Sequence, residues 1–371
     1  MDAPVGAAGQ VRLRRLRLKN HRNYAQLDLT PGAGVNVFIG PNGHGKTNLL
    51  EAVAMLALSS SPRARRDFEL VGPVAPGSRI EAEVESGGTR RELAITLDVE
   101  GDRARRTIEV DGARRRAFDL PGNFRVTLFW PDDLGLVKGG PELRRRFLNQ
   151  MLVQVEPGYA RALAGLRRVL EQRNTLLKRI AAGEGGEDML EAWNLELVQV
   201  GAQVAAARAR AVRELEPDAA RCHAEIAAGE RLQIDYVGPP ENLAEAVNNS
   251  LAEDLRRGTT SVGPHRDDVR VVLDGHDARS FASQGQQRTA VVSLKLAEAA
   301  LLERRTNERP VLLLDDVLSE LDSDRRAALL REIASGGQVI VTSVEAGPFP
   351  PDLIAHAMVW TVTEGKIEPC G

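Results

Sequence analysis

Hydrophobic positions near the start of the chain follow the two-residue period of β-strands. Apolar and basic residues alternate from Val11 to Leu18, which is typical of a strand with one buried face. The short apolar run Val35 to Ile39 predicts a buried strand, and apolar positions from Asn48 to Leu58 recur at helical spacing. Three more alternating runs, separated by Gly- and Asp-rich turns, predict an antiparallel meander: residues 79–85, 92–99 and 106–110.

The pattern changes to the helical period after a strand predicted at Val126 to Trp130. Apolar stripes run through Tyr159 to Ala181 and Asp188 to Leu215, and a Gly-rich turn lies between them. They predict an antiparallel helical hairpin whose arms are about 35–40 Å long at 1.5 Å per residue. Further helices are expected at residues 142–152, 218–227, 241–257 and 288–304.

The turn between the first buried strand and its helix carries clear chemistry. It fits the phosphate-binding pattern G-x-x-x-x-G-K-[ST] with Gly40, Pro41, Asn42, Gly43, His44, Gly45, Lys46 and Thr47. A Gly-rich loop points its backbone N–H groups at phosphate oxygens, and the helix N-terminus adds partial positive charge. Lys46 is expected to reach the β- and γ-phosphates of ATP, and Thr47 to ligate Mg²⁺. The alternative, a tight turn without a ligand, is disfavoured because the spacing and both flanks match.

A second apolar run, Val311 to Leu314, ends in the pair Asp315 and Asp316. Enzymes with a P-loop hold Mg²⁺ and orient water at such a strand end. We expect Asp315 to bind the metal through water and Asp316 to polarise the attacking water. The alternative is that the pair only caps the next element.

The turn Ser283-Gln284-Gly285-Gln286 opens the helix that follows it and offers a second phosphate-binding geometry. Alone it is weak evidence, because Ser and Gly are also ordinary capping residues. In the order P-loop, Ser-x-Gly-Gln turn, Asp-Asp strand and Ser319 to Asp322, however, the chain resembles an ATPase head of the ABC class.

That resemblance implies an α/β fold with two lobes and an ATP-dependent homodimer. Ser283, Gly285 and Gln286 of one copy would cover the γ-phosphate bound by the other, and Asp322 would lie at the seam. Lys46, Ser283 and Asp316 would form the catalytic set. Lobe I would comprise residues 1–125 and 290–371, with a mixed sheet around the P-loop and an antiparallel sheet beside it. Lobe II, residues 126–289, would be mainly helical and carry the short hairpin.

Composition changes this picture only in detail. The 371 residues carry a net charge of −3, so no overall basic field indicates a nucleic-acid partner. Residues 1–150 hold 21 Arg and 3 Lys against 18 Asp and Glu, a balance of +6 that favours an anion-binding surface there. The two cysteines are far apart in the sequence, no apolar run is long enough to span a membrane, and Met1 to Gln10 lacks a signal-peptide pattern. These observations predict a cytoplasmic protein with no membrane contact.

Several motifs together resemble the RecF family of bacterial recombination and gap-repair ATPases, and the resemblance runs through nearly the whole chain. They are Leu18 to Tyr24, Pro131 to Leu134, Lys138 to Pro141 with Arg144 to Arg146, Gly263 to Asp268, and Ser283 to Arg288. The resemblance implies ATP-dependent binding of duplex DNA and of single-strand/duplex junctions, in gap repair and replication restart. It also implies help to the RecO and RecR proteins in loading the RecA recombinase, and DNA-stimulated ATP hydrolysis that releases the dimer.

Three departures from the wider ABC pattern predict slow hydrolysis. Asp316 stands where most transporters have Glu. No His follows the strand at 339–341, so Thr342 or Ser343 would sense the γ-phosphate. No Gln ends the strand at 126–130, so Asp132 or Asp133 would couple the lobes to the metal. A transporter ATPase subunit and an SMC-like DNA clamp are the alternative functions.

Overall fold

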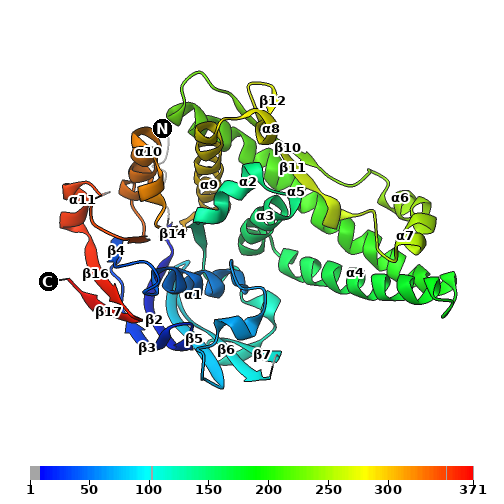
Figure 1. Cartoon of the computed structure of the whole chain (residues 1–371), viewed down its shortest axis with the longest axis horizontal. Coiled ribbons are helices and arrows are strands. Elements are labelled where there is room, and N and C mark those ends of the chain that lie inside the picture. The colour runs from blue at the N-terminus through cyan, green and yellow to red at the C-terminus, as the bar shows by residue number, and fades with distance from the viewer. Residues whose placement is uncertain (1–8, 102, 348, 371) are drawn as a thin grey trace, which may run out of the picture.

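The chain folds into two lobes, which differ in their secondary structure (Figure 1). The computed structural model describes residues 9–101, 103–347 and 349–370. Residues 1–8, which belong to the predicted lobe I and to the segment expected to lack a signal peptide, lie outside the described residues. Lobe I contains two six-stranded sheets, and lobe II is mainly helical, as the sequence predicts.

The first sheet of lobe I has the strand order β17-β16-β4-β15-β14-β9, and all its neighbours are parallel except β16 and β17. Because the strands are parallel, the carboxyl ends of β4, β15 and β14 meet at one edge. The strands are β4 (Val35–Ile39), β9 (Val126–Phe129), β14 (Val311–Asp315), β15 (Val339–Ser343), β16 (Met358–Thr363) and β17 (Lys366–Pro369).

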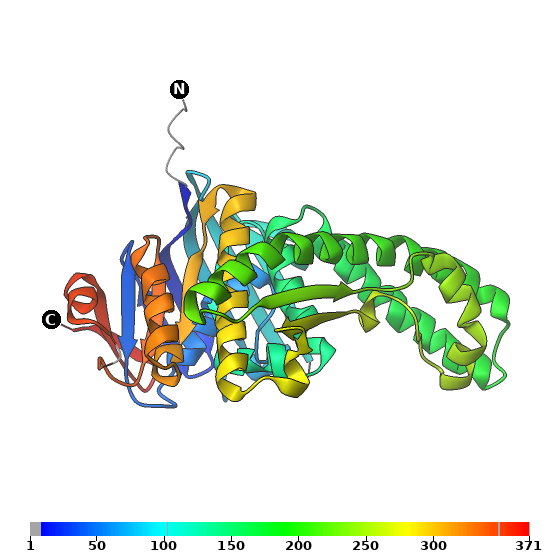
Figure 2. The same cartoon turned by 90° about the horizontal axis from the view of Figure 1, so that it is seen from above.

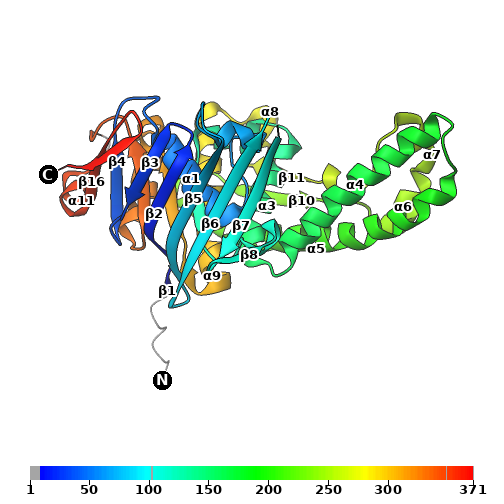
Figure 3. The same cartoon turned by 90° about the horizontal axis from the view of Figure 1, so that it is seen from below.

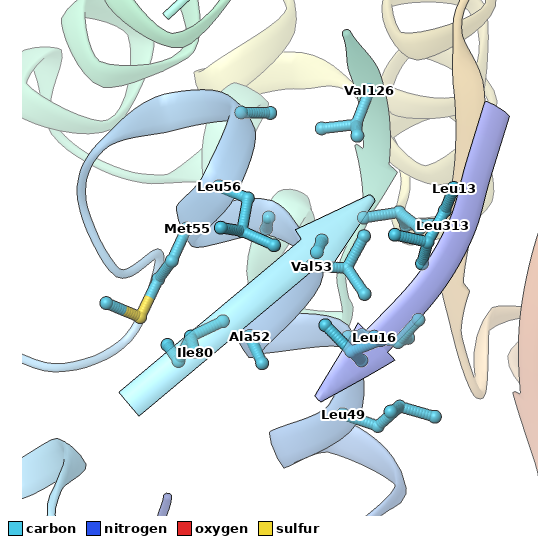
Figure 4. Close-up of a cluster of buried hydrophobic side chains, with 14 of the residues drawn as sticks. Leu13, Leu16, Leu49, Ala52, Val53, Met55, Leu56, Ile80, Val126 and Leu313 are labelled. Carbon is cyan, nitrogen blue, oxygen red and sulfur yellow. The ribbon is translucent and has the colours of Figure 1, made fainter. Parts of the chain in front are cut away.

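The second sheet is the predicted antiparallel meander, in the order β3-β2-β5-β6-β7-β8 (Figure 3). Helix α1 (Lys46–Leu58) lies between the two sheets and is buried from Leu49 to Leu58. Figure 4 shows α1 side chains packing between Leu16 and Ile80 of the meander and Leu313 of the parallel sheet. The meander strands are β2 (Arg12–His21), β3 (Tyr24–Leu29), β5 (Gly77–Ser86), β6 (Thr89–Glu100), β7 (Arg103–Val110) and β8 (Ala113–Arg115).

The helical hairpin of lobe II consists of α4 (Tyr159–Ala181) and α5 (Glu191–Ile226). It reaches away from the two sheets, and α6 (Leu243–Asn249) and α7 (Leu251–Arg257) lie against its far end (Figures 2 and 3). The remaining larger elements of this half are α3 (Pro141–Val155), β10 (Leu232–Val237), β11 (Asp268–Leu273), α9 (Gln284–Thr306) and α10 (Ser323–Ala334).

Two helix predictions are wrong in their boundaries. Helix α5 continues through Pro217, where the sequence predicts a break before a separate helix at 218–227. Helix α9 holds α5 at this point, because Arg304 donates to the Glu214 carbonyl at 3.0 Å and Arg305 forms an ion pair with Glu214. The single helix expected at 241–257 is instead the pair α6 and α7, which meet at Ser250.

The predicted lobe boundaries also need correction at both ends of lobe II. Residues 126–129 form β9, which pairs in parallel with β14 and so belongs to the sheet of lobe I. The boundary at 289/290 falls inside α9, which is continuous and packs against α5 of lobe II as well as β9. Helix α9 therefore connects the lobes. Within the described residues, no helix has the length and apolar content needed to span a membrane.

Candidate nucleotide site

The predicted phosphate loop connects β4 to α1 at the end of the parallel sheet, and its last two residues, Lys46 and Thr47, are the first two of α1. Gly43 and Gly45 have φ angles of +83° and +114°, which favour glycine. A Cβ atom on Gly40 would lie 2.2 Å from the Val362 carbonyl oxygen, so a side chain there would collide with β16. The loop backbone thus depends on its glycines and is shaped by strands far away in the sequence.

Lys46 is buried at the base of this loop. Its Nζ donates to the carbonyl oxygens of Gly40 at 2.5 Å and Pro41 at 3.0 Å. Burial lowers the pKa of Lys46, while the nearby carboxylates of Asp316 and Asp315 oppose that shift. A partly desolvated ammonium attracts a phosphate more strongly than one in water, since the local dielectric constant is lower.

Thr47, Asp315 and Thr342 form a hydrogen-bonded cluster at the ends of three elements. The Thr47 hydroxyl lies 2.9 and 3.1 Å from the two Asp315 carboxylate oxygens, and Thr342 Oγ1 lies 2.9 Å from Oδ1. Burial raises the pKa of Asp315, and the hydrogen bonds from Thr342 and Thr47 oppose the rise. One hydroxyl and one carboxylate suit Mg²⁺, which takes its remaining oxygen ligands from phosphates and water.

Asp316 follows in a left-handed conformation, with φ +50°. Its backbone N–H lies 3.2 Å from the Thr342 carbonyl, and Ser319 Oγ lies 3.0 Å from its Oδ1 atom. Of the two predicted γ-phosphate sensors, Thr342 therefore contacts both acidic residues. Ser343 contributes its carbonyl, which accepts from Gly40 N–H at 3.2 Å.

The turn between β2 and β3 supports the loop from the other side. Asn23 Nδ2 donates to the His44 carbonyl at 2.9 Å, and Tyr24 Oη donates to the Gly45 carbonyl at 3.0 Å. Arg22 forms an ion pair with Glu51 of α1, which is fully buried. In the sequence these residues contributed only to the family resemblance, and their physical role was missed.

Arg63 is a second residue that sequence reasoning did not place at the site. Its Nη1 donates to Asn48 Oδ1 at 3.2 Å, and its guanidinium lies 5.8 Å from the Trp130 ring centroid. It also contributes to lowering the pKa of Asp315, against the larger effect of burial. The Arg-rich segment after α1 was the available signal, but the sequence shows no pattern that directs it to the nucleotide.

The signature turn forms a second group of predicted site residues. Ser283 caps α9, with its hydroxyl accepting from Gln286 N–H at 3.2 Å and its own N–H donating to Gln286 Oε1 at 2.9 Å. Arg325 of α10 donates to the Gly285 carbonyl at 2.7 Å and forms an ion pair with Asp322. Ser283, Gly285, Gln286 and Asp322 are thus brought together by α9 and α10.

The two groups are not joined within the described residues. No hydrogen bond or ion pair there connects Ser283 or Gly285 to residues 40–47, and Ser283 is exposed. The structure therefore assembles the P-loop with Asp315 and Asp316, and it leaves the signature turn on the surface.

The two candidates for coupling the lobes differ in their surroundings. Asp133 Oδ2 accepts from Trp130 N–H at 2.7 Å, whereas Asp132 is exposed. Burial raises the pKa of Asp133, and the nearby Lys295 of α9 opposes the rise. Lys295 also forms an ion pair with Glu298. Asp133 lies near both the end of β9 and Lys295 of α9, so it is better placed than Asp132 to couple the two lobes.

Comparison with known proteins shows which family the chain belongs to. The family model described as RecF/RecN/SMC N terminal domain matches residues 12–351. A protein of Moorella thermoacetica named DNA replication and repair protein RecF is 40% identical over 357 residues, which cover 95% of each chain. The chain belongs to the RecF family.

Other RecF proteins and structures extend the match. The RecF protein of Synechococcus sp. strain JA-3-3Ab is 41% identical over 373 residues, covering 96% of this chain and 97% of its own. A solved structure of the recombination mediator protein RecF with ATP, described as part of the RecFOR pathway, has a TM-score of 0.90 at 30% identity and covers 100% of both chains. An Smc head domain from Pyrococcus furiosus has a TM-score of 0.54 at 14% identity, covering 97% of this chain and 96% of its own, and shares the fold.

Proposed function

We propose that this RecF-family chain is an ATP-dependent DNA-binding protein of recombinational gap repair and replication restart. The observation that carries the proposal is the separation described above. A complete P-loop and acidic pair stand in one group, and an exposed signature turn stands in another. ATP held by the first group would leave its γ-phosphate open to the second group of another copy.

Lys46 would contact the β- and γ-phosphates, and the N–H groups from Gly40 to Gly45 would surround them. Thr47 and Asp315 would hold Mg²⁺, which supplies charge neutralisation when it is bound. Asp316 would accept a proton from the attacking water, and Ser319 would keep its carboxylate in place. The hydrogen-bonded contact of Thr47 with Asp315 supports these roles.

Two copies would close around two ATP molecules as an isologous dimer. Ser283, Gly285 and Gln286 would reach the partner's γ-phosphate, and Asp322 would lie at the seam. The exposed position of Ser283 and the rigid support of the turn by Arg325 favour this arrangement. Hydrolysis would be slow and stimulated by DNA, and it would release the dimer.

The DNA ligand and the protein partners follow from the family. The relatives are named DNA replication and repair proteins, and a solved relative is described within the RecFOR pathway. We propose that the closed dimer binds duplex DNA and single-strand/duplex junctions in the cytoplasm, and that it assists RecO and RecR in loading RecA.

The test is the molecular mass in solution of wild type, Lys46→Ala and Ser283→Arg, each measured with and without Mg-ATP. We expect wild type to double its mass only with Mg-ATP and both variants to stay monomeric. Ser283→Arg should still bind ATP as a monomer, because its own P-loop is intact. Asn248→Arg adds the same side chain at an exposed position on α6 and should dimerise like wild type.

The outcomes separate the parts of the proposal. Dimerisation of Ser283→Arg with ATP would show that the signature turn does not act on a second copy. Failure of wild type to bind gapped or duplex DNA in the dimeric state would contradict the DNA-binding function itself.

A further inference from the structure

A large cleft lies between the lobes, outside the P-loop. Its volume is about 1310 Å³, which exceeds the 300–1,000 Å³ typical of small-molecule pockets. One wall consists of the segment Ser59 to Arg65 with Phe118 and Trp130, and the other consists of residues of α3 and α4. In size, this cleft suits a segment of a polymer rather than a metabolite.

Most arginines that line the cleft have no acidic partner within the described residues, and the exception is Arg208, which pairs with Asp267. Arg63, Arg65, Arg146 and Arg167 are all exposed, and none forms an ion pair within the described residues. Arg145 donates only to the Asp267 carbonyl, at 2.6 Å. Three carboxylates also line the cleft, those of Asp132, Asp133 and Glu142, so cationic side chains outnumber anionic ones.

Four arginines on the first strands of the meander are arranged differently. Arg14, Arg15, Arg17 and Arg79 all form ion pairs with acidic residues of their own sheet. Other meander arginines, among them Arg90, Arg105 and Arg114, are exposed and form no ion pair within the described residues, but they lie on an open sheet surface and not in the cleft. Between the lobes, the unpaired positive charge lies in the cleft.

Aromatic side chains accompany this charge. Phe118 is half-buried, and the guanidinium carbons of Arg116 and Arg161 lie 5.7 and 5.1 Å from its ring centroid. Trp130 also lines the cleft but is buried beneath Arg63, so Phe118 is the ring that is accessible to a base. Aromatic rings combined with cationic side chains are typical of surfaces that bind single-stranded nucleic acid, since bases stack on the rings and phosphates contact the cations.

We propose that this cleft binds single-stranded DNA, as the unpaired arm that continues from a duplex. The inference rests on the proposed DNA-binding function, and it places the single-stranded arm of the junction in the cleft. Arg63 contacts both Trp130 in the cleft and Asn48 at the start of α1, so a strand in the cleft lies beside the nucleotide site.

The test compares Arg146→Ala/Arg167→Ala with the control Arg213→Ala/Arg270→Ala. The control removes two exposed arginines that lie away from the cleft and form no ion pair with any described residue. Binding would be measured with Mg-ATP to a labelled oligo(dT) strand, a blunt duplex and a duplex with a single-stranded tail. We expect the cleft variant to bind oligo(dT) and the tailed duplex about 10- to 100-fold more weakly. The slope of log K against log salt for oligo(dT) should fall in magnitude by about 1.4, or 0.7 for each lost phosphate contact.

Binding of the blunt duplex and ATP-dependent dimerisation should change less than threefold in both double variants. A second measurement places the photoreactive residue benzoylphenylalanine at position 118, where we expect crosslinking to oligo(dT) and to the single-stranded tail. Equal loss of blunt-duplex binding, or no crosslink to either strand, would overturn the proposal while leaving DNA binding intact. Crosslinking of the photoreactive residue to polyglutamate, without crosslinking to oligo(dT), would also overturn the proposal. It would indicate that the cleft binds an acidic protein. Absence of all DNA binding in wild type would instead contradict the proposed function.

Discussion

The two halves of the nucleotide site are held in place by different kinds of contact. The P-loop half is tied to the core through Arg22 and the fully buried Glu51 and through glycines that fit against neighbouring backbone. The signature half is a surface turn held by a capping box and by Arg325. Changes in the buried support of the first half should therefore cost folding stability, whereas changes in the support of the second should cost only association.

The largest effect is expected where both halves must work together, at Asp316. Asp316→Asn should lower ATP hydrolysis by about 10²- to 10⁴-fold, the usual contribution of a general base. ATP affinity and ATP-dependent dimerisation should persist, because Lys46 and Ser283 are unchanged. The rate of phosphate release measures hydrolysis, and the molecular mass in solution measures dimerisation. The control is Asp324→Asn, at an exposed position of α10. Hydrolysis within twofold of wild type would exclude Asp316 as the base.

The buried support of the P-loop half is tested at Arg22. Arg22→Met should lower the free energy of unfolding by about 3 kcal/mol, because it leaves the buried Glu51 carboxylate without its cation. Arg15→Met is the matched control and should leave the free energy of unfolding close to wild type, since its pair with Asp28 is solvent-exposed. Urea unfolding measures both values. Equal losses would show that burial of the pair does not support the loop.

The same region should make stability depend on pH through His21. Burial lowers the pKa of His21 to about 4, with Arg22 adding to the shift and Glu51 opposing it. The unfolded chain, with an ordinary histidine pKa near 6.5, binds the proton more readily. Stability is therefore fully present above about pH 6.5 and is lost as the pH falls towards 4, by up to ~3 kcal/mol. The slope of unfolding free energy against pH in this window should be shallower in His21→Gln, and equal slopes would contradict the assignment.

The smallest effect is expected in the signature half. Arg325→Ala removes the contacts with Gly285, Thr289 and Asp322 and should weaken ATP-dependent dimerisation roughly tenfold, because the signature turn loses charged hydrogen bonds that hold it. ATP binding by the monomer and the unfolding free energy should stay close to wild type. Dilution series followed by mass in solution, with Arg331→Ala as the control, measure the association. A marked loss of folding stability in Arg325→Ala would contradict the expectation that contacts in the signature half support association and not folding.

Features encoded by neighbouring residues could be predicted from the sequence. The P-loop with its strand and helix, the Asp315–Asp316 strand end, the meander and the hairpin all follow from local periodicity, and the structure has them. Ser283 and Asp322 were chosen from motif order, and the structure brings them together through Arg325.

Features that depend on distant contacts could not be predicted. Pro217 predicts a helix end, yet contacts from α9 hold α5 in one piece. The choice between Thr342 and Ser343 depends on the register of β14 with β15, which pairs Asp315 with Thr342. Whether an arginine has a carboxylate partner, as Arg14 has in Glu85 and Arg146 has not within the described residues, also depends on the tertiary arrangement.

The strand order of the parallel sheet has a consequence for how the protein is made. Strand β4, which leads into the P-loop, lies between β15 and β16, and these begin at Val339 and Met358. At 5–20 residues per second, a ribosome needs roughly 15–60 s after making β4 to deliver both neighbours. The meander strands from β2 to β8 are all synthesised early and can pair with one another in that interval. A nascent chain would therefore have its antiparallel sheet well before it can hold ATP, and a chain whose translation stops early would not compete for nucleotide.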